Sequence, residues 1–370
     1  MSGLYVGLMS GTSLDGVDAV LADFDGPTPT VLGHCSAPLP PPLRAELLAL
    51  NSPTDNELHR AALAANGLAR LYAGQVRVLL QQCGVAASAV RAIGAHGQTV
   101  RHRPQEFDGT GYTLQLNNPS LLAELCGIEV VADFRSRDVA AGGQGAPLVP
   151  PFHQAYFGRT DQALAVLNIG GISNLTVLDP AAPDLCGFDC GPGNALMDVW
   201  CQTHTGRAYD DAGQWAAQGH VHAGLLAGLL DEPFFAKRPP KSTGRDLFNG
   251  PWLSAKLAGF GELAPQDVQA TLTELTALSS ARSLLDVSRH CTRLIVCGGG
   301  ALNAYLMQRL QTALPLCQVV SSAEHGLPPL QVEATAFAWL ARQTVLGKTS
   351  SLKSVTGAQG ARILGAIYPA

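Results

Sequence analysis

The chain has 370 residues, of which 46% are hydrophobic and 14% are charged, and its formal net charge at pH 7 is −5. This length favours two compact units over one, and the apolar content excludes a disordered protein. The negative charge, without any run of Lys or Arg, excludes an electrostatic nucleic-acid surface. We find no apolar run of membrane-spanning length and no signal peptide, so we expect a cytoplasmic protein with no membrane partner.

The first element in chain order is a polar turn between two apolar segments. Leu4, Val6 and Leu8 alternate before the stretch GLMSGTSLDGVD (7–18). Glycine and hydroxyl residues in such a turn bring N–H and O–H groups within reach of phosphate oxygens. The carboxylates of Asp15 and Asp18 then make sense beside a divalent cation. A tight hairpin without a ligand explains the same residues about equally well.

Residues 57–134 alternate between helical and strand patterns. Apolar spacing predicts a helix over 57–82 that ends at Gly84, then a strand over 92–100 and a second one over 113–116. Asn118 and Pro119 are typical of a helix start, and we expect that helix to end near Gly127 before a strand over 128–134. The Gly-, Ala- and Pro-rich segment 137–153 is predicted to be a hinge or binding loop.

A second hairpin is predicted in the other half of the chain. The segment ALAVLNIGGISNLTVL (163–178) has two apolar strands around Gly170, Gly171, Ser173 and Asn174. It therefore repeats the form of the first hairpin, and a repeated hairpin is a more specific signal of a phosphate site than one copy.

The remaining segments are typical of an α/β unit. LCGFDCGPGN (185–194) is predicted to be a short strand that runs into a turn and a helix from Pro192 to Trp200, and long helices are predicted over 211–230 and 265–290. RLIVCGGGALN (293–303) is predicted to be a strand, a glycine turn and a helix from Asn303, which is a geometry that lets backbone approach a nucleotide. A close packing turn also explains these glycines. A short strand over 318–322 and a helix over 329–347 complete the chain. No Walker A or Rossmann motif occurs in it.

Seven collinear motifs carry a resemblance that covers residues 7 to about 340. They are GLMSGTSLDGVD, GAHGQTVRHRP, ADFRSRDVAAGGQGAPLVP, LNIGGISNLT, FDCGPGN, STGRDLFN and VCGGGALN. Together they resemble the anhydro-N-acetylmuramic acid kinase family of the actin, hexokinase and sugar-kinase superfamily. This resemblance implies a two-lobed α/β fold of the ribonuclease H-like type, with an ATP and sugar cleft between lobes formed by residues 1–131 plus 343–370 and by residues 132–342.

The resemblance also implies the reaction. Such kinases use ATP, Mg²⁺ and water to open the 1,6-anhydro ring of anhydro-N-acetylmuramic acid and to phosphorylate its 6-oxygen, which gives N-acetylmuramic acid 6-phosphate during cell-wall recycling. The family's base is the aspartate of FDxGPGN, which corresponds to Asp189. The partners implied are a small sugar and a possible second copy of the chain.

The resemblance assigns further residues to binding. The family's ATP and phosphate segments match Gly11, Thr12, Ser13, Leu14, Asp15, Gly16, Val17, Asp18, Gly170, Gly171, Ser173, Asn174, Gly298, Gly299, Gly300 and Asn303. Phosphoryl transfer also needs Mg²⁺, and Asp15 and Asp18 are the candidates for arranging this ion through water. Segments on the sugar side contain His96, Asp133, Arg135 and Glu333.

Alternative interpretations remain open for several of these residues. Arg135 fits a paired contact with the sugar's carboxylate, but a solvated or inter-lobe ion pair fits equally well. His96 is expected to be held structurally or to touch substrate without proton transfer. Glu333 could be a helix-start carboxylate or a substrate acceptor, and Asp189 could cap a helix that starts at Pro192.

Two other functional classes also fit the sequence. One is another sugar or carboxylate kinase of the same superfamily. The other is a nucleotide-gated binding protein without catalysis, although the chain shows no helix-turn-helix module of the kind that sensing regulators carry. The combination of FDCGPGN with GAHGQT favours the anhydro-sugar kinase.

Overall fold

The structure, a computed structural model, describes residues 3–11, 13–26 and 28–370. The chain divides into two compact units: unit 1 is Met1–Tyr156 with Leu330–Ala370, and unit 2 is Phe157–Pro329. These boundaries differ from the predicted lobes, because residues 132–156 and 330–342 belong to unit 1. Within the described residues no helix is long and apolar enough to cross a bilayer.

Unit 1 is built on a six-stranded sheet in the order β13-β7-β4-β1-β2-β3. β1 (Leu4–Met9), β2 (Gly16–Asp23) and β3 (Thr30–Pro38) form an antiparallel meander. β4 (Ala92–Ala95) is parallel to β1, β7 (Val130–Ala132) is parallel to β4, and β13 (Ala366–Tyr368) is antiparallel to β7. The predicted first hairpin is therefore confirmed as β1 and β2, while β3 had no sequence signal that we recognised.

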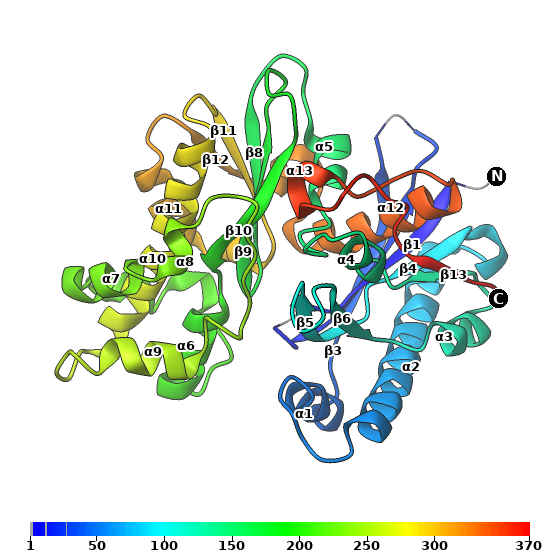
Figure 1. Cartoon of the computed structure of the whole chain (residues 1–370), viewed down its shortest axis with the longest axis horizontal. Coiled ribbons are helices and arrows are strands. Elements are labelled where there is room, and N and C mark those ends of the chain that lie inside the picture. Colours follow the sequence, from blue (N-terminus) through cyan, green and yellow to red (C-terminus); the bar gives the residue numbers. More distant parts are fainter. Residues whose placement is uncertain (1–2, 12, 27) are drawn as a thin grey trace. The chain divides into compact units, whose positions relative to one another are not determined.

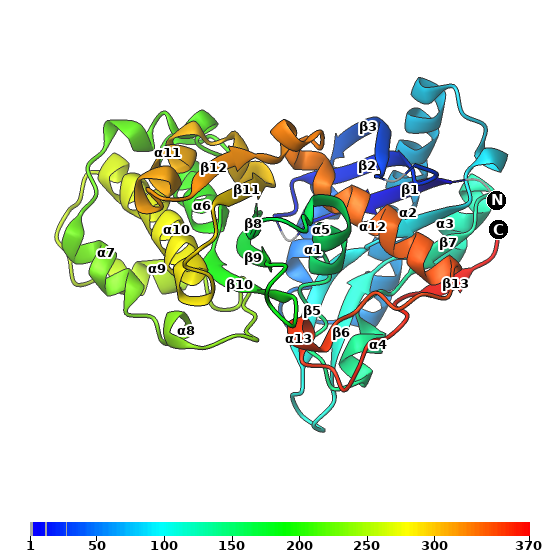
Figure 2. The same ribbon diagram turned by 90° about the horizontal axis from the view of Figure 1, so that it is seen from above.

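Two helices cover the sheet of unit 1 on opposite faces (Figures 1 and 2). α2 (Glu57–Cys83) packs Leu68, Tyr72 and Leu79 into one apolar core with Val6 and Leu8, and it ends at Gly84 as predicted. α12 (Val332–Val345) packs on the other face, in the core that contains Tyr5 and Val20. The alternation of Tyr5, Val6 and Leu8 between the two cores follows the twofold period of a strand.

The smaller elements of unit 1 mostly match the sequence pattern. α1 (Pro41–Ala49) follows β3, α3 (Pro119–Cys126) starts after the capping residue Asn118 as predicted, and β5 (Gln98–Pro104) pairs with β6 (Gly111–Leu116). The predicted strand over 92–100 is two strands, because Gly97 has a φ of 78° between them. The predicted loop over 137–153 contains parts of α4 (Ser136–Ala140) and α5 (Pro150–Phe157), and α13 (Lys353–Thr356) follows late in the chain.

Unit 2 repeats the strand topology of unit 1. Its sheet has the order β10-β9-β8-β11-β12, formed by β10 (Cys186–Pro192), β9 (Ile172–Leu178), β8 (Leu164–Ile169), β11 (Arg293–Cys297) and β12 (Gln318–Ser321). β8, β9 and β10 form an antiparallel meander, and β11 is parallel to both β8 and β12. In unit 1 the strands β3-β2-β1-β4-β7 have the same order and the same relative directions as β10-β9-β8-β11-β12 in unit 2. The predicted ribonuclease H-like fold is therefore confirmed, as two copies of one α/β topology.

The helices of unit 2 depart from the prediction in one region. α10 (Pro265–Val287) and α11 (Ala304–Ala313) confirm two predicted helices and pack against each other, and α6 (Ala195–Thr205) follows β10. The predicted helix over 211–230 is instead two short 3₁₀ turns (Asp211–Gly213 and Ala216–Gln218) and α7 (Ala223–Leu230). The buried Asp210 carboxylate accepts the N–H groups of Trp215 and Ala216, which favours tight turns over a continuous helix. α8 (Pro233–Ala236) and α9 (Gly250–Leu257) complete the unit.

Candidate active site

The turn between β1 and β2 holds the first predicted phosphate loop. The Leu14 N–H donates to the Gly11 carbonyl at 3.2 Å, and Leu14 is buried with a φ of 57°. The Ser13 hydroxyl and the Gly16 N–H both donate to Asp15 Oδ1, at 2.8 and 2.9 Å. The turn is thus tied by its own polar groups. Val17 is buried on β2, and Thr12 lies outside the described residues.

The two predicted magnesium residues differ in their surroundings. Asp15 is exposed at the turn, whereas Asp18 lies within β2 and its Oδ1 is 3.0 Å from His34 Nε2 on β3. The described residues contain no cluster of three or more His, Cys, Asp or Glu that could hold a metal ion directly. A role of Asp15 and Asp18 in holding Mg²⁺ through water stays a prediction.

His96 joins the first hairpin to Arg135 within unit 1. The His96 Nδ1–H donates to the Ser10 carbonyl at 3.3 Å, and Arg135 donates from Nη2 to His96 Nε2 at 2.9 Å. The Arg135 Nη1–H donates to the Gly145 carbonyl at 2.7 Å. Burial, followed by the charge of Arg135, lowers the pKa of His96 to about 3. A neutral imidazole therefore orients the guanidinium, and His96 is not placed to exchange protons near neutral pH.

The two carboxylates on the predicted sugar side are held differently. Asp133 is exposed, has a φ of 60°, and accepts the Ser136 hydroxyl at 2.5 Å. Glu333 lies in the first turn of α12, where the helix dipole stabilises a carboxylate. Their contact with a sugar stays a prediction.

The second hairpin, between β8 and β9, is linked to the FDCGPGN motif. The N–H groups of Gly193 and Asn194 donate to the carbonyls of Gly171 and Gly170, at 3.0 and 2.8 Å. Ser173 is fully buried and its hydroxyl donates to the Pro192 carbonyl at 3.4 Å. The end of β10 therefore fixes the shape of the Gly170–Gly171 turn.

Asp189 lies on β10 in a row of polar side chains that crosses the sheet of unit 2. In the strand register Asp189 faces Asn174, Asn174 faces Asn168, and Asn168 faces Cys297. Directly paired residues project from the same face of a sheet. This row lies at the carboxyl ends of the parallel strands β8 and β11. Open α/β sheets bind their ligands at the carboxyl ends of their strands.

Asp189 does not cap a helix. It is the fourth residue of β10, it is 7% exposed, and the register with β9 shifts directly after it, between Asp189 and Gly191. Asp189 Oδ2 accepts the N–H of Thr243 at 2.9 Å, and its own N–H donates to the Lys241 carbonyl at 3.1 Å. α6 begins at Ala195 after Asn194, so a helix start at Pro192 and the capping interpretation of Asp189 are wrong.

The glycine turn after β11 has both structural and open positions. Gly298 has a φ of 76°, and a Cβ on Gly300 would collide with the Ile169 side chain. A Cβ on Gly299 would only touch Asn194 Nδ2 at 3.4 Å. Asn303 caps α11, where its side chain accepts the Leu306 N–H at 2.9 Å. Gly298 and Gly300 are therefore needed for close packing, and a contact of Gly299 with a nucleotide stays a prediction.

The comparisons with known proteins cover nearly the whole chain. The model of the family described as anhydro-N-acetylmuramic acid kinase matches residues 3–370. Proteins of that name from Albidiferax ferrireducens and Variovorax paradoxus are 64% and 65% identical to this chain; the first alignment covers 100% of both chains and the second covers 99% of both. A third, from Cupriavidus pinatubonensis, is 58% identical over 99% of this chain and 98% of its own length.

The chain belongs to the anhydro-N-acetylmuramic acid kinase family.

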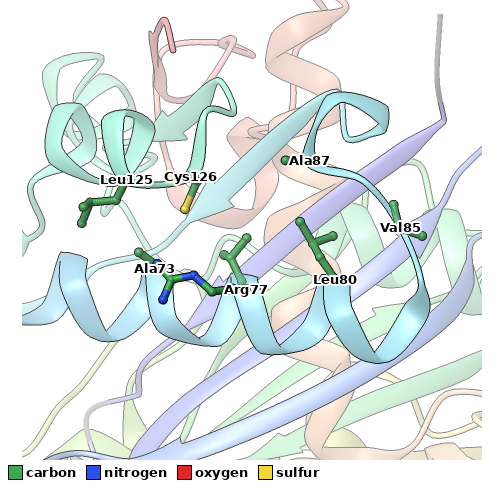
Figure 3. Close-up of a pocket in the computed structure, with 8 residues that line it drawn as sticks. Ala73, Arg77, Leu80, Val85, Ala87, Leu125 and Cys126 are labelled. Carbon is green, nitrogen blue, oxygen red and sulfur yellow. The ribbon is translucent and has the colours of Figure 1, made fainter.

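One pocket of unit 1 contains none of the residues that the sequence assigned to the site of an anhydro-N-acetylmuramic acid kinase. Figure 3 shows it in unit 1 beside α2, lined mainly by apolar side chains, with Arg77 and Cys126 as its polar groups. Burial raises the pKa of Cys126 to about 11, so its thiol stays protonated. None of the residues predicted from the sequence lines this pocket, and we assign it no role.

Three residues next to the predicted ones were missed by the sequence analysis. Asn168 lies in the LNIGG motif of this kinase family, where only the glycines were considered. Asn194 is the last residue of FDCGPGN, where only the aspartate was considered as a functional residue. Thr243 lies in STGRDLFN, a motif that carried the resemblance but received no role. The contact between Thr243 and Asp189 joins residues 54 positions apart, and no spacing rule predicts it.

Proposed function

We propose that this chain is an ATP-dependent kinase that hydrolytically opens 1,6-anhydro-N-acetylmuramic acid and phosphorylates its 6-oxygen, as in cell-wall recycling. Membership of the family over residues 3–370, with relatives at 64% and 65% identity, supports the substrate and the reaction. The observation that carries the chemistry is the carboxylate of Asp189, held on a strand at the sheet edge where unit 2 would bind its ligands.

Asp189 is proposed to be the general base. Its carboxylate takes a proton from water while the water oxygen bonds to the anomeric carbon, and the bond from that carbon to the 6-oxygen breaks. The released 6-oxygen then bonds to the γ-phosphorus of ATP, and ADP leaves with the electrons of the broken phosphorus–oxygen bond. These two steps give N-acetylmuramic acid 6-phosphate and ADP.

The glycine turns are proposed to hold the nucleotide. Gly11 and Gly170 stand in corresponding hairpins of the two repeated topologies, and Gly299 follows β11 at the same edge as Gly170. Backbone N–H groups of such turns bind phosphate oxygens because no side chain blocks their approach. Mg²⁺ bound with ATP would neutralise phosphate charge, and the carboxylates of Asp15 and Asp18 fit its water shell.

Arg135 is proposed to bind the sugar's lactyl carboxylate. Its guanidinium is held by His96 and by the Gly145 carbonyl, so its direction is fixed before a substrate arrives. A preorganised guanidinium loses less conformational freedom when it pairs with a carboxylate. His96 therefore acts through Arg135, while Asp133 and Glu333 complete the proposed sugar side. A cytoplasmic location and a homodimer are further parts of the proposal.

The experiment that tests this function compares the wild type with Asp189→Asn. Asparagine keeps an oxygen that can accept the Thr243 N–H but cannot take the proton, so turnover should fall by about 10²–10⁴-fold. The melting temperature and the affinity for ATP should change little. Turnover of the variant within a few-fold of the wild type would remove Asp189 from the mechanism, and lack of phosphorylation of the anhydro sugar by the wild type would reject the substrate.

A further inference from the structure

A short segment covers the open edge of β10 at Asp189. β10 is the last strand of the five-stranded sheet, so one of its edges has no neighbouring strand. Residues Lys241–Thr243, which we call the strap, lie against this edge and make both of the hydrogen bonds described above for Asp189. Edge strands are commonly covered by a loop or a helix, so the presence of the strap does not by itself indicate a role in catalysis.

The hydrogen-bond pattern of the strap differs from that of an added strand. A parallel strand would accept the Asp189 N–H at the carbonyl of residue 241 and would donate the N–H of residue 243 to the Asp189 carbonyl. The first bond is present at 3.1 Å. The Thr243 N–H instead donates to the side-chain Oδ2 of Asp189 at 2.9 Å. The strap therefore holds the carboxylate itself.

Lys241 anchors the strap in the apolar part of unit 2. Lys241 is 9% exposed, and its Nζ lies 4.7 Å from the ring centre of Phe234 and 5.8 Å from that of Phe188. Burial lowers the pKa of Lys241, while the charges of Asp286 and Asp189 and the thiol of Cys190 oppose that shift and Lys237 adds to it. These contacts of the Lys241 cation with two aromatic rings anchor the backbone that follows it.

We propose that Lys241 and Thr243 are positioning residues that fix the orientation and the ionised state of the Asp189 carboxylate. This inference rests on the proposed role of Asp189 as the base. A backbone N–H donor favours the charged form of a carboxylate and restricts its rotation. Both effects serve a base that must point at one water, since a displacement of about 1 Å can cost about 10²-fold in rate.

The first test removes the N–H donor. Thr243→Pro lacks this donor, whereas Thr243→Ala keeps it and loses only a hydroxyl that has no hydrogen-bond partner among the described residues. We expect kcat of the Pro variant to be at least about 10-fold below that of the Ala variant, with the KM for ATP within about 2-fold. The acid limb of its kcat–pH profile should move to higher pH, because the carboxylate loses a hydrogen bond that favours its charged form.

The second test leaves the backbone of the strap intact. Lys241→Met removes the cation at similar length, and Lys241→Arg keeps it. We expect Lys241→Met to lower kcat and to raise the pH of the acid limb, and Lys241→Arg to restore part of both. This pair decides the question if Thr243→Pro does not fold.

The outcomes separate this inference from the proposed function. If the melting temperature falls in the variants but kcat and the pH profile match the wild type, the strap only covers a sheet edge and the inference is wrong. If Asp189→Asn is inactive while the strap variants behave in this way, the proposed function stands without the strap. If Asp189→Asn turns over normally, both fail.

Discussion

Two histidines of unit 1 are kept neutral by burial. His96 accepts from Arg135, and His153 of α5 is fully buried. Burial lowers the pKa of each imidazole to about 3, and the charge of Arg135 adds to this for His96. An unfolded histidine has a pKa of about 6.5, so the unfolded chain binds more protons than the native chain between these two values.

The stability of unit 1 should therefore depend on pH in a defined window. Well above pH 6.5 each histidine is neutral in both the folded and the unfolded chain, so the free energy of unfolding does not depend on the protonation of these two groups. As the pH falls from 6.5 towards 3, each histidine should lower it by about 1.4 kcal/mol per pH unit. Urea unfolding at pH 4 to 7, followed by hydrogen exchange in β4 and α5, measures this slope.

A single substitution provides the control for the pH dependence. His153→Gln removes one of the two titrating groups, so its unfolding free energy should fall about half as steeply with decreasing pH in the same window. An unchanged slope would show that His153 is not protonated on unfolding in this range.

The packing of α12 on β1 and β4 depends on two glycines. A Cβ on Gly7 would collide with the Ala334 carbonyl, and a Cβ on Gly94 would collide with the Phe337 carbonyl. Both obstacles are helix backbone, which cannot rotate away as a side chain can. The helix that carries Glu333 is therefore held close to the strands that lead into Ser10 and His96.

This contact gives an element-level prediction with a matched control. Gly94→Ala should destabilise unit 1 by about 1–3 kcal/mol because it overpacks the interface between helix and sheet. Gly74→Ala on α2, where a Cβ meets no atom within 4 Å, should stabilise it by about 0.5–1 kcal/mol. Chemical denaturation of both variants checks the signs. Equal effects of the two substitutions would contradict the packing argument.

Local signals determined how well each element could be predicted. α2 and α3 were recognised because apolar spacing, the capping Asn118 and the terminal glycines agree with the observed helices. The region 211–230 misled the prediction because the buried Asp210 carboxylate binds two backbone N–H groups of residues that follow it, and no apolar pattern records that contact. The contacts of Arg135 with His96 and of Asp189 with Thr243 are long-range and were equally invisible.

Across the whole molecule, the repeat seen in the sequence is larger than a hairpin. The sequence showed two Gly- and Ser-containing turns, and the structure shows that each opens the same five-strand pattern. The motifs of the candidate site were recognisable because they are local runs of glycine and polar residues. The unit boundaries were not, since residues 330–370 return to a sheet that starts more than 300 positions earlier.

The repeat predicts the same behaviour for one glycine in each of the two hairpins, Gly11 and Gly170. A Cβ on Gly11 comes no closer than 3.4 Å to Ser13 Oγ, and one on Gly170 no closer than 3.9 Å to the Ile172 carbonyl. Neither glycine has a positive φ. Alanine should therefore fit at both positions and change stability by no more than about 0.5 kcal/mol. If these glycines serve phosphate binding, a methyl group there displaces phosphate oxygens that would otherwise contact the backbone.

Gly11→Ala and Gly170→Ala should each raise the KM for ATP by about 10–100-fold, which corresponds to one lost hydrogen bond to a charged phosphate. The dissociation constant of the anhydro sugar, measured without nucleotide, should stay within about 2-fold. Gly300→Ala is the contrasting variant, since its Cβ collides with Ile169 and should lower the melting temperature. If sugar affinity falls as much as ATP affinity, or if ATP affinity is unchanged in both variants, the two hairpins are structural turns. The predicted phosphate-binding role would then be wrong for both hairpins, because the same feature, a glycine turn between the first two strands of the sheet, supports it in each unit.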